Sequence, residues 1–198
     1  MRSSPCLSPI GSAPNVPPPP ALSDVVVMPL DGTSAVLAGE ALARSLARRL
    51  WPDDRVPVDP FAIASALGLA VHHTDLPSPV CGQLHVVPGQ QPRIVIDNVS
   101  STSRRRFTCA HEIGHYLRRP NQAAAIFIDE RSDLAGLGVD VEEVFANQFA
   151  AALVMPATLV RQQVRAGKSV AEMAAYFVTS PPALTRRLRN LRLTAPGR

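Results

Sequence analysis

Two histidines four residues apart, His111 and His115, enclose Glu112 in the middle of a segment that the pattern predicts to be helical, 101–119. Residues four apart lie on the same face of a helix, about 5–6 Å from one another. Both imidazoles can therefore bind one tetrahedral zinc ion. Glu112 follows the first histidine directly, where it can accept a proton from a water molecule rather than bind the metal. The motif therefore requires a helix at this point and predicts that the fold supplies a third ligand from another element.

The next predicted helix, 140–154, offers Glu142 and Glu143 as that third ligand. A catalytic zinc ion takes three protein ligands and keeps one position open. The spacing of the apolar residues does not separate the two glutamates, because each lies three or four positions before the apolar residue Ala146. Asn147 lies four residues after Glu143, on the same side of the helix, where it could orient the first histidine. This favours Glu143 as the ligand.

The remaining pattern predicts an α+β domain with a small mixed sheet and no internal repeat. Residues 121–138 show no period and are predicted to form a loop. The element ends follow ordinary signals, such as Asp59-Pro60 as cap and first residue of a helix. Helices are predicted over 39–50, 60–67, 101–119, 140–154, 157–166, 169–177 and 181–192, and strands over 69–74, 82–87 and 93–97.

The chain is predicted to have three parts. Residues 1–36 form a Pro-rich tail, with four consecutive prolines at 17–20, and are expected to be disordered. Residues 37–160 form the main domain, and 161–198 form a basic helical region. After Pro156 there are eight basic residues against one acidic residue, Glu172. This basic segment could contact DNA or an acidic partner, although it could equally be a solvated helix face.

Three cysteines without a CxxC pair indicate a reducing compartment, and therefore a cytoplasmic protein, rather than a disulfide framework. No run of 18 apolar residues is present, so no membrane-spanning helix is expected. The histidines at 72, 73 and 85 fall on predicted strands. Because adjacent strand residues point to opposite faces, His72 and His73 cannot enter one site, and all three are interpreted as structural.

Two linked motifs resemble a known family. The stretch Arg105–Leu117 is similar to the signature helix of the ImmA/IrrE metallopeptidases, and Glu143–Pro156 matches that family's Glu-x-x-Ala-Asn-x-Phe-Ala-Ala block, which ends in Met-Pro. Ile94–Asn98 resembles the edge strand that usually precedes the signature helix. The resemblance covers about residues 40 to 193.

This resemblance implies a zincin-like metallopeptidase fold, with His111, His115 and Glu143 as zinc ligands and Glu112 as the catalyst. It also implies a limited cut in a protein substrate, a helix-turn-helix repressor or an antitoxin-like protein. Such a cut would relieve repression of phage, mobile-element or stress genes. The Pro-rich tail and the segment 121–138 depart from the family pattern, so substrate specificity cannot be carried over.

An extended substrate would add to the sheet as a further strand. The expected partner is the strand 93–97, through the main chain of Ile94, Val95 and Ile96. The oxyanion-stabilising group cannot be identified from the sequence.

Two readings without catalysis remain open. The segment 170–193 has the outline of two short helices that resemble a helix-turn-helix, which would make the protein a DNA-binding regulator. Arginines 186, 187 and 189 lie on the second of these helices. The other reading is one component of a toxin–antitoxin pair whose site is idle. Glu112 argues against an idle site, because a purely structural zinc ion needs no general base.

Overall fold

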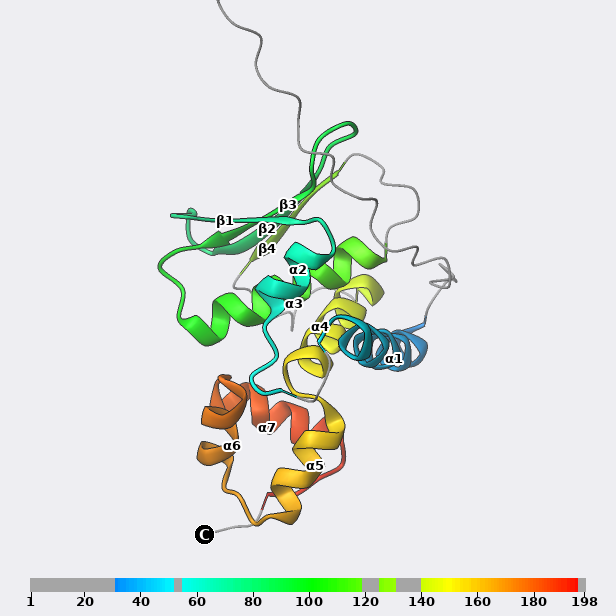
Figure 1. Cartoon of the computed structure of the whole chain (residues 1–198), viewed down its shortest axis with the longest axis vertical. Coiled ribbons are helices and arrows are strands. Elements are labelled where there is room, and N and C mark those ends of the chain that lie inside the picture. The colour runs from blue at the N-terminus through cyan, green and yellow to red at the C-terminus, as the bar shows by residue number, and fades with distance from the viewer. Residues whose placement is uncertain (1–30, 52–54, 119–124, 131–139, 196–198) are drawn as a thin grey trace, which may run out of the picture.

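The computed structural model describes residues 31–51, 55–118, 125–130 and 140–195. It confirms the α+β class with a small mixed sheet, which lies at one end of the molecule with the labelled helices all on one side of it (Figure 1). In chain order the described elements are α1 (Gly32–Leu50), α2 (Pro60–Ala66), β1 (Ala70–Thr74), β2 (Val80–Val86), β3 (Arg93–Asp97), α3 (Thr102–Leu117), β4 (Ala125–Glu130), α4 (Val141–Val154), α5 (Ala157–Arg165), α6 (Val170–Phe177) and α7 (Pro181–Asn190).

The four described strands lie in the order β1-β3-β2-β4, so that β3 is an inner strand. It pairs in parallel with β1 and antiparallel with β2. The expectation that Ile94, Val95 and Ile96 form an edge strand is therefore wrong, because both main-chain edges of β3 are already hydrogen bonded. Ile94 and Ile96 face the core and are fully buried. The sequence shows which residues form a strand, but the order of strands depends on distant pairing.

The segment 121–138 was expected to be a loop, and β4 corrects that expectation for residues 125–130. β4 pairs antiparallel with β2, with Gly82 opposite Asp129 and Leu84 opposite Phe127. An apolar run this short does not indicate a strand by its period, since strand formation here depends on the neighbouring strand.

Helix α1 begins at Gly32, earlier than expected, so residues 32–36 are helical and do not belong to the Pro-rich tail. The cause is a capping box in which Asp31 accepts a hydrogen bond from the backbone N–H of Ser34 at 2.7 Å, and Ser34 bonds back to the backbone of Asp31. The sequence pattern missed this box because the N3 residue is a serine rather than Glu or Gln. The rest of the predicted tail, residues 1–30, lies outside the described residues.

Helix α4 lies at the centre of the helical layer, between α1 and α3. Glycines let the three helices approach closely. A Cβ atom at Gly39 of α1 would lie 2.9 Å from the carbonyl oxygen of Phe145, and one at Gly114 of α3 would lie 3.2 Å from Cα of Ala146. The large side chains of α4, Phe145 and Phe149, are buried against these neighbours. This packing sets the spacing between α3 and α4.

The C-terminal helices α5–α7 lie at the end of the molecule away from the sheet (Figure 1). Arg187 of α7 is 1% exposed and binds the carboxylate of Glu40 on α1 through two nitrogens, at 2.6 and 2.9 Å. Its Nε donates to the carbonyl oxygen of Met155, at 3.0 Å. Gln148 of α4 also donates to Glu40, at 2.9 Å. One buried arginine thus joins α7 to α1 and to the end of α4. The predicted boundary between the main domain, 37–160, and the basic C-terminal region, 161–198, stays a prediction.

Within the described residues, no single helix is long and apolar enough to cross a membrane. Helices α4 and α5 are long and apolar enough only when taken together, and they meet at a bend of 53°. Most of α4 is buried in the protein core.

Candidate metal centre

Helix α3 carries both histidines on its buried face. The helix begins after Ser101, whose hydroxyl oxygen accepts a hydrogen bond from the backbone N–H of Arg104 at 3.3 Å. His111 and His115 are 3% and 6% exposed. Their Nε2 atoms lie 2.9 Å apart, so the two ring nitrogens point to one place, as the spacing of four residues predicts.

Glu143, in the first turn of α4, completes this group. Its two carboxylate oxygens lie 3.3 Å from Nε2 of His111 and 3.0 Å from Nε2 of His115. The hydrogen bonds from the two imidazoles hold the pKa of Glu143 well below its ordinary value, although partial burial acts in the opposite direction. Glu142 turns away and binds Arg118 instead, with Nε to Oε2 at 3.1 Å. The structure thus brings Glu143, and not Glu142, to the histidines.

The three side chains fit a metal ion. One ligand atom from each of His111, His115 and Glu143 lies within 4.8 Å of the others. Two nitrogens bound to one tetrahedral zinc ion lie ~3.3 Å apart, given Zn–N distances of about 2.0–2.1 Å. The observed nitrogen separation of 2.9 Å is close to this. Two imidazoles and one carboxylate are also a known donor set of catalytic zinc sites, which leave one coordination position open.

Glu112 lies beside the group on α3 and is fully buried. Strand β2 lies close to Glu112, because a Cβ atom at Gly82 would lie 3.6 Å from Oε1 of Glu112 and 2.3 Å from Cγ2 of Thr108. The absence of a side chain at Gly82 therefore allows α3 to pack directly under β2. A buried carboxylate next to a metal site is suited to proton transfer.

Replacing Gly82 by alanine is expected to destabilise the fold by about 2 kcal/mol, within the range for overpacked cores. The new methyl group would clash with Thr108 Cγ2, and a β-branched side chain on a helix has little rotamer freedom to move away. Chemical unfolding measures the loss. The double variant Gly82→Ala with Thr108→Ser removes the clashing methyl and should recover most of the stability. No recovery would mean that the clash lies elsewhere.

Other predicted site residues are not brought into the group. Asn147 is partly exposed, and among the described residues no hydrogen bond joins its side chain to either histidine. Ile94 and Ile96 are part of the core, as noted above, and only Val95 faces the opposite side of the sheet. The role predicted for Asn147 stays a prediction.

Two residues close to the site were not singled out from the sequence. In the sequence Gly82 is only the first residue of a predicted strand, and Arg118 belongs to neither motif. Arg118 lies three residues after His115, one turn further along the same helix, a spacing that could have indicated it. Cys109 is buried, and burial raises the pKa of its thiol, with the charges of Asp59 and Glu112 adding to the effect. Nε2 of His85 donates a hydrogen bond to Oε1 of Gln83 at 2.9 Å.

The fold and the grouped side chains define a metallopeptidase-type domain, in which a His-Glu-x-x-His helix packs under a small sheet beside a helix that supplies a glutamate. The family model of the IrrE N-terminal-like domain, Peptidase M78, matches residues 63–189. The chain belongs to this family. A search of curated proteins found no match.

Proposed function

We propose that this protein is a zinc-dependent endopeptidase. The observation that carries the proposal is the convergence of His111, His115 and Glu143, with Glu112 buried on the same helix as the histidines. Membership of a metallopeptidase family supports it. The donor set favours zinc, since imidazole nitrogens and a carboxylate suit this ion, whereas magnesium and calcium prefer oxygen ligands alone.

In the proposed reaction, water adds across a peptide bond of the substrate. When bound, zinc would polarise the scissile carbonyl and lower the pKa of the attacking water towards about 7. Glu112 would accept the proton that this water loses as its oxygen bonds to the carbonyl carbon. Glu112 would then give a proton to the leaving nitrogen as the C–N bond breaks, so the carboxylate is regenerated. His111, His115 and Glu143 would hold the ion.

The substrate is proposed to be a protein segment in extended form. β4 has only β2 as a hydrogen-bonded neighbour among the described strands, and its Asp129 pairs with Gly82, a residue close to Glu112. A segment added beside β4 would therefore lie near the proposed base, and β4 replaces β3 as the expected partner strand. We propose a repressor or an antitoxin-like protein as the substrate, as the resemblance of the two motifs to the ImmA/IrrE metallopeptidases implies, and its limited cleavage would relieve repression of phage, mobile-element or stress genes. We also propose a cytoplasmic location, supported by the three cysteines of the sequence, an odd number without a CxxC pair.

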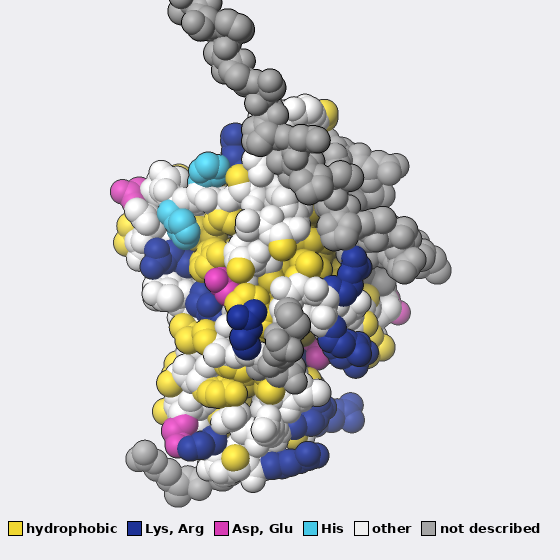
Figure 2. Space-filling model, in the orientation of Figure 1, with side chains coloured by type: hydrophobic (Ala, Val, Ile, Leu, Met, Phe, Trp, Pro, Cys, Tyr) yellow, Lys and Arg dark blue, Asp and Glu magenta, His cyan; other side chains and the backbone are white. Residues whose placement is uncertain are grey.

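A second candidate function is contact with DNA. Helices α6 and α7 are joined by a turn of three residues, the first of which, Val178, has the left-handed backbone conformation with φ of 51°. Two short helices joined by such a turn have the outline of a helix-turn-helix. Arg186 and Arg189 are exposed on α7, and Figure 2 shows Lys and Arg side chains over the C-terminal helices and α1. Arg187 cannot take part, because Glu40 holds it in the interior. Binding to a DNA duplex that weakens with salt would support this function, and no binding at low salt would contradict it.

The first test is the zinc content of protein purified without added metal. We expect near one zinc per wild-type chain, and a large loss in Glu143→Ala, because a carboxylate ligand is removed. Asp75→Ala, which removes an exposed carboxylate on the loop after β1, is the matched control and should keep its zinc. Wild-type protein that takes up no zinc even when zinc is added would contradict the proposed function.

A further inference from the structure

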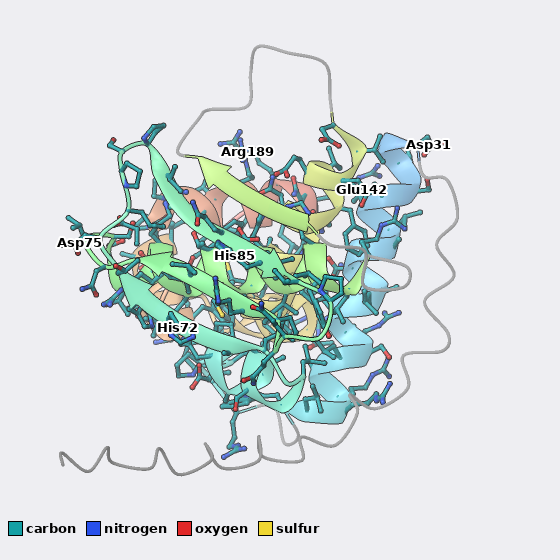
Figure 3. The ribbon with its side chains drawn as sticks, turned by 90° about the horizontal axis from the view of Figure 1, so that it is seen from above. Asp31, His72, Asp75, His85, Glu142 and Arg189 are labelled. Atoms are coloured by element: carbon teal, nitrogen blue, oxygen red, sulfur yellow. The ribbon has the colours of Figure 1, made fainter. Side chains whose placement is uncertain are left out.

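Two adjacent glutamates begin α4, and they have different partners. Successive helix residues point about 100° apart, because a turn holds 3.6 residues. Glu143 faces the two histidines, whereas Glu142 is 48% exposed and binds Arg118. Figure 3 shows Glu142 at the N-terminal end of α4. The backbone N–H of Glu142 also bonds to the cap residue Asp140, at 2.9 Å.

Arg118 is the residue that connects this turn to the helix of the histidines. It follows the last residue of α3, and its backbone N–H donates to the carbonyl oxygen of Gly114 at 3.2 Å. Its guanidinium binds both oxygens of Glu142, through Nε and Nη2, and lies 5.2 Å from the ring centre of Phe145. The side chain is only 7% exposed. A two-point contact with a carboxylate fixes direction as well as distance.

Arg118 therefore contacts the residue before Glu143 and the residue two positions after it. These contacts set both the rotation of the first turn of α4 and its position along α3. We propose that Arg118 is a positioning residue for the metal centre, which keeps Glu143 as the carboxylate that faces His111 and His115. The inference rests on the proposed zinc site and names no new ligand.

Two physical effects make this contact matter for a metal ion. Ligand atoms must lie within about 0.2 Å of their ideal distances, so a small rotation of the first turn of α4 would weaken binding. In addition, a divalent cation attracts any carboxylate that is not already paired. With its charge paired to Arg118, Glu142 does not compete with the neighbouring Glu143 for the ion. Lysine cannot replace this arginine, because an ammonium group lacks the planar fork that meets both oxygens.

The test compares zinc affinity and fold stability in the full chain. Arg118→Gln should lower zinc affinity, measured by competition with a chelator, at least about tenfold. It should also change the visible absorption spectrum of the cobalt-substituted protein, which reports the ligand geometry. Exchanging the pair, Arg118→Glu with Glu142→Arg, should restore part of the affinity. Arg104→Gln, which changes an exposed arginine in the first turn of α3, is the matched control and should bind zinc as wild type does.

Thermal unfolding of the metal-free proteins separates positioning from a general structural role. If Arg118→Gln unfolds at a lower temperature but binds zinc and cobalt as wild type does, the positioning role is overturned. Should that variant fail to fold, Glu142→Gln weakens the same contact without leaving a carboxylate to compete for the ion, and its half-exposed side chain leaves the core intact. Lower zinc affinity in Glu142→Gln would support the positioning role, and unchanged affinity would overturn it. Wild-type protein that binds no zinc would instead overturn the proposed function, and this inference with it.

Discussion

Replacing Glu112 by glutamine is expected to lower the rate of substrate cleavage by at least about 100-fold, the lower end of the contribution of a positioned general base. Glutamine has almost the same shape as glutamate, so the packing of α3 under β2 is retained. It cannot accept a proton from water, however, and Glu143, the carboxylate of the metal-binding group, is proposed to hold the ion. The measurement is the single-turnover rate of cleavage of a partner protein.

The zinc content of the Glu112→Gln protein decides how a loss of activity is read. We expect it to equal that of wild type, because Glu112 is not among the three proposed ligands. Glu172→Gln, a change to an exposed carboxylate on α6, is the control for the chemical change itself and should cut normally. Cleavage at the wild-type rate by the Glu112 variant would show that another group takes the proton.

Local features of the fold could be predicted from the sequence because their causes are local. Asp59 and Pro60 mark the start of α2, and the structure shows Asp59 accepting a hydrogen bond from the backbone N–H of Phe61 at 2.9 Å. The bounds of β3, Arg93–Asp97, are as predicted. The grouping of His111 with His115 follows from helix geometry alone.

What could not be predicted depends on contacts between distant residues. The apolar period of α4 did not separate Glu142 from Glu143, and the choice is made by Arg118 on another helix. The position of β3 inside the sheet depends on its pairing with β1 and β2. The basic residues at the end of the chain are typical of an exposed, solvated helix face. Arg187 among them is nevertheless buried and paired with Glu40, which is 147 residues away in sequence.

Replacing Arg187 by methionine is expected to lower the free energy of unfolding by about 3 kcal/mol, the lower end of the range for a broken buried ion pair. The lower end applies because Glu40 keeps 27% of its side chain exposed, so water can solvate part of the remaining charge. The variant also loses the hydrogen bond to the carbonyl oxygen of Met155. Denaturant unfolding near pH 7 measures the difference. Arg186→Met, the exposed neighbour on α7, is the control and should change stability by less than about 0.5 kcal/mol.

The same pair predicts a pH dependence with a definite sign. Burial by itself would raise the pKa of Glu40, but the hydrogen bonds and charge of Arg187 outweigh burial and hold this pKa below its ordinary value of 4.5. The Arg187–Glu40 pair therefore makes its full contribution to the free energy of unfolding above about pH 4.5, and this contribution is lost as the pH falls through the pKa of folded Glu40. In Arg187→Met, Glu40 stays partly buried without the arginine, so its negative charge destabilises the folded state. Protonation of Glu40 should therefore stabilise this variant. The stability difference between wild type and variant should thus narrow on acidification. A constant difference down to the acid transition would mean that Arg187 stabilises the fold through packing rather than through its charge.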